Sequence, residues 1–230
     1  MRNTKNHLNA SARRLRIGLA VAASALAVCV LPATALGATA TDTTQFAVTA
    51  STLSFSTAPN APDLPGLTLN GQAQTLNAQM ANYTVADATG SAAGWNVTVA
   101  GDGPAGSAVF KQFCNNGSNP CGGDAQQAYV SGGATLAANS LTLNSTSASM
   151  TAINSAGSGP THSCNSGCFV DSAAPVKVTS AATGNAGMGT YQLNGYTATS
   201  LALNAPTTVK SLPANEVYRV NLLWTLNSGP

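Results

Sequence analysis

The side chains best suited to chemistry in this 230-residue sequence are four cysteines and a histidine. Cys114 and Cys121 lie in CNNGSNPC, Cys164 and Cys168 lie in CNSGC, and His162 precedes the second pair. Four cysteines in an exported chain indicate two disulfides, with three possible connectivities. We expect the local bridges Cys114–Cys121 and Cys164–Cys168, because each pair flanks a Gly/Asn turn that can bring the Cα atoms within about 7 Å. A zinc site with His162 is the competing interpretation, but the spacings are not C-x-x-C and an exported chain meets oxidising surroundings.

No arrangement of side chains in the sequence indicates catalysis. There is no G-x-S-x-G elbow, and a glycosidase needs two opposed carboxylates, which only the fold could assemble here. Asp102 stands in GDGP, and Asp87 precedes Ala-Thr-Gly, so we expect both to serve turns. We therefore predict that the protein is not an enzyme and has no metal site and no cofactor. The acidic residues are scattered: Asp42, Asp63, Asp87, Asp102, Asp124, Asp171 and Glu216.

Residues 1–37 have the order of a secretory signal peptide. A basic head is followed by the uncharged apolar run 17–31 and then by small residues after Pro32. Fifteen apolar residues fall short of the roughly 20 that span a bilayer. We expect cleavage after Gly37, Ala38 or Ala40. The basic head consists of Arg2, Lys5, Arg13, Arg14 and Arg16.

Three signals for other export or anchoring routes are incomplete. Arg13-Arg14 lacks the continuation of a twin-arginine signal, and Cys29 follows Val28 where a lipoprotein needs a small residue. The sequence LPATA at 31–35 resembles a sortase signal but lies at the wrong end. We expect no membrane anchor after signal cleavage, and any attachment to a cell wall is then non-covalent.

The charge of the exported part argues against polyanionic partners. Five of the nine Lys and Arg lie in the signal and all seven Asp and Glu lie outside it, so four cations face seven anions, a net charge of −3. Nucleic acids and anionic membranes bind through clustered Lys and Arg. We predict neither partner. The four cations are Lys111, Lys177, Lys210 and Arg219.

Short alternating runs separated by turn residues predict an all-β fold. The runs 46–48 and 53–55 indicate the first strand or pair of strands, and the prolines of 56–66 indicate a loop. Hydrophobic residues make up 44% of the chain, and we find no capped amphipathic helix. Residues 38–230 predict a single-domain antiparallel β-sandwich, with a barrel as the alternative. Several runs end in Leu-Asn, which is typical of a strand entering a turn: at Asn70, Asn77, Asn144, Asn194, Asn204 and Asn227.

The strongest strand signal lies in residues 216–230. Every second residue from 218 to 226 is large and apolar, and only Leu223 breaks the alternation. Successive side chains of a strand point to opposite faces, so one face of this strand is apolar. The apolar positions are Tyr218, Val220, Leu222, Trp224 and Leu226.

Two tryptophan motifs resemble those of the WxL cell-wall-binding domains of Gram-positive bacteria. Trp224-Thr-Leu226 closes the last strand, and Trp95-Asn-Val97 follows Asp87 and a Gly-rich turn. Val97 stands where the family has Leu. The resemblance implies a secreted, wall-associated protein that binds peptidoglycan, with both motifs involved. The motif residues are Trp95, Val97, Trp224 and Leu226.

The same tryptophans have a structural interpretation. Trp95 is in register with Val97 and Val99, and Trp224 with Leu222 and Leu226, as core residues of two strands would be. Both interpretations hold if the tryptophans form the frame and neighbouring loops contact glycan. An alternative function is a structural or adhesive surface subunit that assembles with partner proteins, for example by adding a strand at an exposed sheet edge.

Overall fold

The structure is a computed structural model that describes residues 42–115, 121, 127–155 and 159–230. The chain divides into two units, Met1–Phe46 and Ala47–Pro230. The predicted signal peptide, residues 1–37, lies outside the described residues. All strands of the described chain belong to the second unit, and its described residues contain no helix. The all-β prediction is confirmed.

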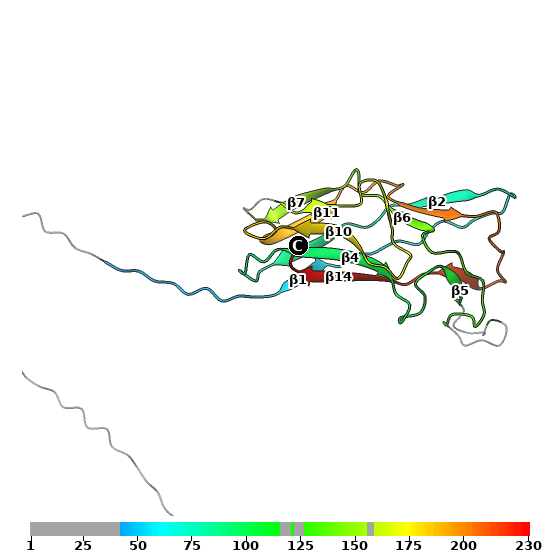
Figure 1. The fold of residues 1–230 in the computed structure, drawn as a ribbon, viewed down its shortest axis with the longest axis horizontal. Coiled ribbons are helices and arrows are strands. Elements are labelled where there is room, and N and C mark those ends of the chain that lie inside the picture. The colour runs from blue at the N-terminus through cyan, green and yellow to red at the C-terminus, as the bar shows by residue number, and fades with distance from the viewer. Residues whose placement is uncertain (1–41, 116–120, 122–126, 156–158) are drawn as a thin grey trace, which may run out of the picture. The chain divides into compact units, whose positions relative to one another are not determined.

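One layer of the second unit consists of two four-stranded antiparallel sheets, and Figure 1 shows β2 and β6 of one sheet to the right of β7 and β11 of the other. Sheet I has the order β1-β3-β11-β7, and sheet III has the order β2-β12-β6-β9. Along the chain, no other strand lies between β2 and β3 or between β11 and β12. Each of these pairs links the two sheets, so sheet III continues sheet I. The strands of sheet I are Leu53–Thr57 (β1), Tyr83–Asp87 (β3), Gly189–Asn194 (β11) and Ser149–Asn154 (β7). Those of sheet III are Gln74–Ala78 (β2), Leu201–Ala205 (β12), Leu141–Leu143 (β6) and Cys168–Phe169 (β9).

The other layer consists of a four-stranded sheet and a two-stranded ribbon, both antiparallel. Sheet II has the order β14-β4-β10-β8, and the ribbon pairs β13 with β5. Only two residues separate β13 from β14, so the ribbon continues sheet II. The strands of sheet II are Leu222–Ser228 (β14), Trp95–Gly101 (β4), Val176–Ala181 (β10) and Thr161–His162 (β8), and those of the ribbon are Glu216–Arg219 (β13) and Lys111–Cys114 (β5).

Side chains from sheets I and II meet between the two layers. The Tyr83 hydroxyl on β3 lies 3.0 Å from Thr179 Oγ1 on β10. The ring centroid of Tyr83 also lies 6.0 Å from that of Trp224 on β14. The predicted antiparallel β-sandwich is confirmed. The barrel alternative is wrong, because none of the sheets formed by the described residues closes on itself.

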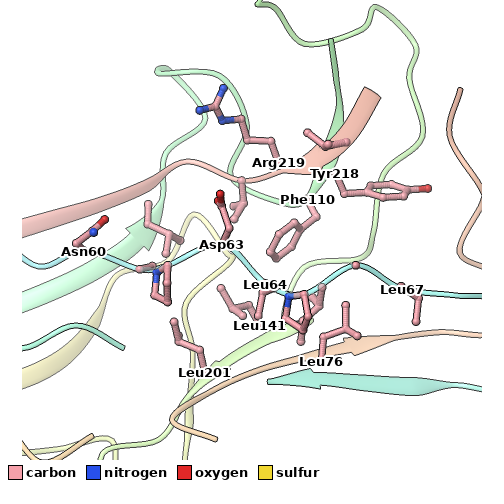
Figure 2. Close-up of a pocket in the computed structure, with 18 of the residues that line it drawn as sticks. Asn60, Asp63, Leu64, Leu67, Leu76, Phe110, Leu141, Leu201, Tyr218 and Arg219 are labelled. Carbon is pink, nitrogen blue, oxygen red and sulfur yellow. The ribbon is translucent and has the colours of Figure 1, made fainter. Parts of the chain in front are cut away.

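Side chains fill the space between the two layers less completely where sheet III faces the ribbon. A groove of about 710 Å³ lies there, between the segment 59–67, the inner face of sheet III and the residues of β13 and β14. Figure 2 shows Leu76, Leu141 and Leu201 projecting into it from sheet III, with Leu64 reaching in from the proline-rich segment. The loop predicted over 56–66 therefore forms one wall of this groove from Pro59 onward.

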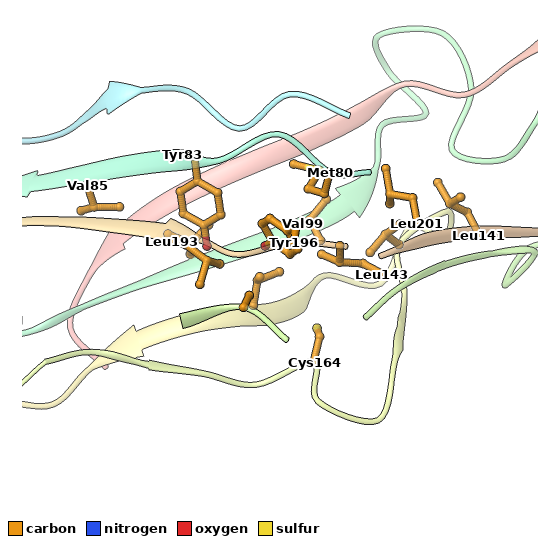
Figure 3. Packing of buried hydrophobic residues seen from close by; sticks show 14 of the residues in the cluster. Met80, Tyr83, Val85, Val99, Leu141, Leu143, Cys164, Leu193, Tyr196 and Leu201 are labelled. Carbon is orange, nitrogen blue, oxygen red and sulfur yellow. The ribbon is translucent and has the colours of Figure 1, made fainter. Parts of the chain in front are cut away.

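A continuous cluster of buried side chains runs through both parts of the sandwich. Figure 3 shows Tyr83 and Val85 of sheet I in line with Leu143 and Leu201 of sheet III. Each fully buried side chain of this size contributes about 1.5 to 3 kcal/mol relative to exposure. The shared cluster joins the four sheets into one folded unit.

The first predicted strand was wrong in part. Leu53–Thr57 forms β1, but residues 46–48 belong to no strand, and Phe46 and Val48 are 90% and 80% exposed. Alternation alone does not make a strand, because main-chain groups also need a partner strand. Main-chain pairing begins only at Ser51, whose N–H donates to the Ala88 carbonyl.

The single long strand expected near the C-terminus is divided at Asn221. This residue is held by the 102–107 turn: its N–H donates to the Ser107 carbonyl, and its own carbonyl accepts from the Asp102 N–H. Its side chain donates to the Ala105 carbonyl and accepts from the Tyr129 hydroxyl. The chain therefore leaves the ribbon here and enters sheet II.

The Leu-Asn endings were partly correct. Asn144 follows β6 and Asn194 ends β11, as predicted. Asn144 Oδ1 accepts from the Thr146 N–H at 2.8 Å, which closes a turn. Three other asparagines remain inside their strands because these strands extend further than the hydrophobic pattern: Asn77, Asn204 and Asn227.

Candidate functional site

The two tryptophan motifs lie on neighbouring strands. β14 pairs with β4 in antiparallel register, with Val97 opposite Leu226 and Val99 opposite Trp224. Two segments that lie far apart in the sequence thus form one ladder. Because the side chains of both strands alternate in phase, the ladder has one inner face and one outer face.

On the inner face, Trp95 and Val97 are wholly buried. The Trp95 indole N–H donates to the Gly187 carbonyl at 3.0 Å, so its polar group is satisfied inside the core. A ligand cannot touch either side chain while the sandwich is intact. Both residues therefore act as part of the frame.

Trp224 and Leu226 are partly exposed on the same inner face. Trp224 contacts the Tyr83 ring on one side and lines the groove on the other. The two motif tryptophans are therefore not equivalent: Trp95 is enclosed, whereas Trp224 borders open space.

On the outer face, the residues between the apolar positions form two polar rows across three strands. Thr225 lies opposite Thr98, and Thr98 lies opposite Lys177 of β10. The neighbouring row joins Asn227, Asn96 and Ser180, and the Asn227 amide donates to Asn96 Oδ1 at 3.2 Å. We call these six residues the outer motif face: Asn96, Thr98, Lys177, Ser180, Thr225 and Asn227.

A depression of about 480 Å³ opens at one end of the outer motif face. Thr98, Leu223 and Thr225 line it from the sheet, and Pro104 and Pro175 line it from loops. Leu223 is 50% exposed, and it is the residue that broke the alternation in the sequence. The depression thus combines a mostly apolar lining with the hydroxyl groups of two threonines.

The described groups with displaced pKa values lie away from this face. Burial raises the pKa of the Tyr83 and Tyr196 phenols far above the ordinary value, and it raises that of Tyr129 less. Burial also raises the pKa of the Asp171 carboxyl, although backbone N–H groups of residues such as Ser140 oppose the shift. The outer motif face therefore offers hydrogen bonds and the Lys177 cation.

The residues considered for catalysis are placed as follows. His162 Nδ1 lies 3.3 Å from Ser145 Oγ, but Ser145 is wholly buried and no substrate can reach its hydroxyl. Asp87 Oδ1 accepts from the Thr89 N–H, and Asp102 Oδ1 accepts from the Ala105 N–H, so both carboxylates close turns as predicted. Within the described ranges, no group of three or more His, Cys, Asp or Glu could hold a metal.

The predicted cysteine pairing is confirmed. Cys114 is bonded to Cys121, with Cα atoms 5.7 Å apart, and Cys164 is bonded to Cys168, with Cα atoms 5.2 Å apart. Both bridges lie outside the outer motif face and the groove. They close local loops and join no distant strands.

Sequence reasoning missed Lys177, the outer rows and the groove. The polar positions alternating with the motif apolar residues were visible, but their row partners on β10 depend on strand pairing. The only sequence feature that pointed to the groove was the set of prolines in the segment 59–67, which forms one of its walls.

None of the described residues belongs to a helix long and apolar enough to cross a membrane. Searches against protein-family models, curated proteins and solved structures found no match to this chain.

Proposed function

We propose that the protein is a secreted surface protein that binds the peptidoglycan of a cell wall non-covalently, through the outer motif face. The observation that carries the proposal is the pairing of the two motifs into one ladder with a polar outer face. The two sequence motifs resemble those of WxL domains. Because their strands are paired, residues of both motifs contribute to one surface.

The chemistry of the outer motif face suits a glycan. Hydroxyl and amide groups of Thr98, Thr225 and Asn227 can both donate and accept hydrogen bonds, as sugar hydroxyls and N-acetyl groups do. Lys177 continues the threonine row and suits a carboxylate of the peptide stems. The depression beside Leu223 can take a sugar ring or a methyl group.

Two further observations support secretion. The sequence of residues 1–37 has the pattern of a signal peptide. The two disulfides are typical of proteins that fold in an oxidising compartment.

The test is co-sedimentation of the purified protein with insoluble peptidoglycan, with no other protein present. The wild type should pellet, and a Thr98→Ala/Thr225→Ala variant should pellet much less. The matched control is Thr75→Ala/Thr142→Ala, which removes two hydroxyls from the outer face of sheet III and should bind as the wild type does. A wild type that stays in the supernatant, or an outer-face variant that binds fully, would contradict the proposal.

A structural or adhesive subunit that assembles with partner proteins is the second candidate function. The observation that favours it is the exposure of Phe46 and Val48, two apolar side chains that the described chain leaves in solvent. In the co-sedimentation test, this function predicts that the purified protein binds the wall only when a partner is present.

A further inference from the structure

The described chain has an N-terminal segment that exposes two large apolar side chains and has no partner strand. Residues 42–50, which we call the arm, belong to no strand, and Phe46 and Val48 are more exposed than any other large hydrophobic side chain described. The two are separated by one residue, so they share a face when the segment is extended. The opposite face carries Gln45 and Ala47.

The groove has a mixed lining with room for such side chains, because apolar residues lie in its walls beside polar ones such as Asp63 and Arg219. Its walls include Leu76, Leu203, Phe110 and Trp224. Its volume of about 710 Å³ lies within the roughly 300 to 1,000 Å³ of ligand pockets and far exceeds the about 30 Å³ of one water. The groove therefore takes a segment of chain or a ligand of similar size.

The ribbon strand that borders the groove has a free edge. On β5, the Gln112 N–H and carbonyl bond to Ala134 and Val130, on the side away from β13. Lys111 and Phe113 therefore supply the bonds to β13, since consecutive residues of a strand point their main-chain groups to opposite sides. Tyr218 lies opposite Gln112, so its main-chain groups point away from β5, to a side where the described residues provide no strand partner. Tyr218 also lines the groove.

We infer that the arm of one copy adds to the free edge of β13 in a second copy and places Phe46 and Val48 in the groove. The main chain of the arm pairs with that of Tyr218, and Phe46 and Val48 pack against the apolar residues of the groove walls, such as Leu76 and Phe110. Recognition by strand addition combines main-chain hydrogen bonds with pockets for every second side chain. The arm has no charge between residues 43 and 50 that would oppose this burial.

Chain length argues for a second copy over the same copy. From Phe46 to the start of β1 at Leu53, an extended chain spans at most about 25 Å. Pro59 is the first residue along the chain that lines the groove, and it lies roughly 20 Å beyond Leu53 along β1. To reach the groove of its own copy, the arm would have to fold back and cover this distance. Insertion into its own groove would need a reversal with almost no residues left for the turn. Each copy also offers one arm and one groove, so addition can continue head to tail.

The first experiment measures the mass of the mature protein by light scattering over a range of concentrations. The wild type should exceed the monomer mass by at least about twofold at high concentration, as head-to-tail addition requires. A Phe46→Asp/Val48→Asp variant should stay monomeric. The control Gln45→Asp/Ala47→Asp adds the same charge to the opposite face of the arm and should assemble as the wild type does.

The second experiment uses a synthetic peptide of residues 42–50 and the monomeric Phe46→Asp/Val48→Asp protein. Trp224 lines the groove, so the peptide should shift the tryptophan emission, and the shift should disappear when Trp224→Phe is added, because Trp95 is enclosed. A peptide with both aspartates should produce no shift.

Three results would overturn the inference. One is a wild type that is monomeric at every concentration, including the case in which its arm occupies its own groove. Another is assembly that survives Phe46→Asp/Val48→Asp. The third is a peptide without effect on Trp224. Wall co-sedimentation is a separate measurement on a different face, so failure here leaves the proposed wall binding to its own test.

Discussion

The indole nitrogen of Trp95 donates a hydrogen bond of 3.0 Å to the main-chain oxygen of Gly187 inside the sandwich. Gly187 has a φ of 75°, and a Cβ at this position would lie 2.6 Å from the same nitrogen and 2.3 Å from the Ala181 Cβ. The close approach of the indole to this turn therefore requires glycine.

Gly187→Ala should lower the free energy of unfolding by about 2 to 5 kcal/mol. Backbone strain at positive φ costs about 1 to 2 kcal/mol, and overpacking costs about 1 to 3 kcal/mol. Chemical denaturation measures the loss. The control is Gly184→Ala, which has a φ of 91° but no atom within 4 Å of the added Cβ, and should show the strain alone. Equal losses in the two variants would contradict the role of the indole contact.

The two motif tryptophans should differ in their contribution to stability. Trp95→Ala should cost about 3 to 5 kcal/mol, and Trp95→Phe about 1 to 3 kcal/mol, because the latter leaves the Gly187 carbonyl buried without its donor. Trp224→Phe should cost less than about 1.5 kcal/mol, since Trp224 is partly exposed and phenylalanine keeps much of its contact with Tyr83. Denaturation curves of the three variants give these values.

Trp224→Phe should also still bind wall material, because the side chain lies on the inner face and not on the outer motif face. Co-sedimentation with peptidoglycan checks this. If Trp224→Phe keeps its melting temperature and loses all binding, Trp224 itself contacts the glycan, and the outer motif face is not the principal site.

The stability of the protein should fall as the pH rises above about 4. Burial raises the pKa of the Asp171 carboxyl, so the folded state keeps a proton that the unfolded state has already released. The contribution is fully present below the unfolded pKa and is lost as the pH passes the folded pKa. Denaturation at a series of pH values should show this slope, and Asp171→Asn should remove it. Asp63→Asn, a matched substitution at an exposed position, is the control.

The disulfides should each contribute only about 2 to 2.5 kcal/mol, because their loops are short. The bridged residues are 7 and 4 positions apart. Paired Cys→Ala variants, Cys114→Ala/Cys121→Ala and Cys164→Ala/Cys168→Ala, should remain folded and lose about this much in denaturation experiments. A variant that does not fold would show that a bridge decides the fold.

The secreted protein should begin between Ala38 and Thr41, because small residues follow the apolar run at the expected distance. N-terminal sequencing of protein from the culture medium checks this. A chain that begins at Met1, or one acylated at Cys29, would contradict signal cleavage at this position.

The sequence by itself determined the features that depend on neighbouring residues. The alternation of Trp95, Val97 and Val99 follows from the two-residue period of a strand, and all three positions are buried. The bridge Cys114–Cys121 joins cysteines that are only 7 positions apart, and Asp87 closes the turn that its neighbours indicate. In each case the partner lies within a few residues, so local geometry decides the outcome.

Only the tertiary structure decided which segments meet. The pairing of Val97 with Leu226, the addition of Lys177 to the threonine row, and the exposure of Trp224 beside the groove all depend on contacts between distant segments. The same holds for the break at Asn221. Its main chain bonds to Asp102 and Ser107 of the 102–107 turn, although the hydrophobic alternation continues through this position. Hydrophobic alternation fixes which face of a strand is buried, but every alternating strand fits many neighbours, and the choice among them is made by the packing of the whole sandwich.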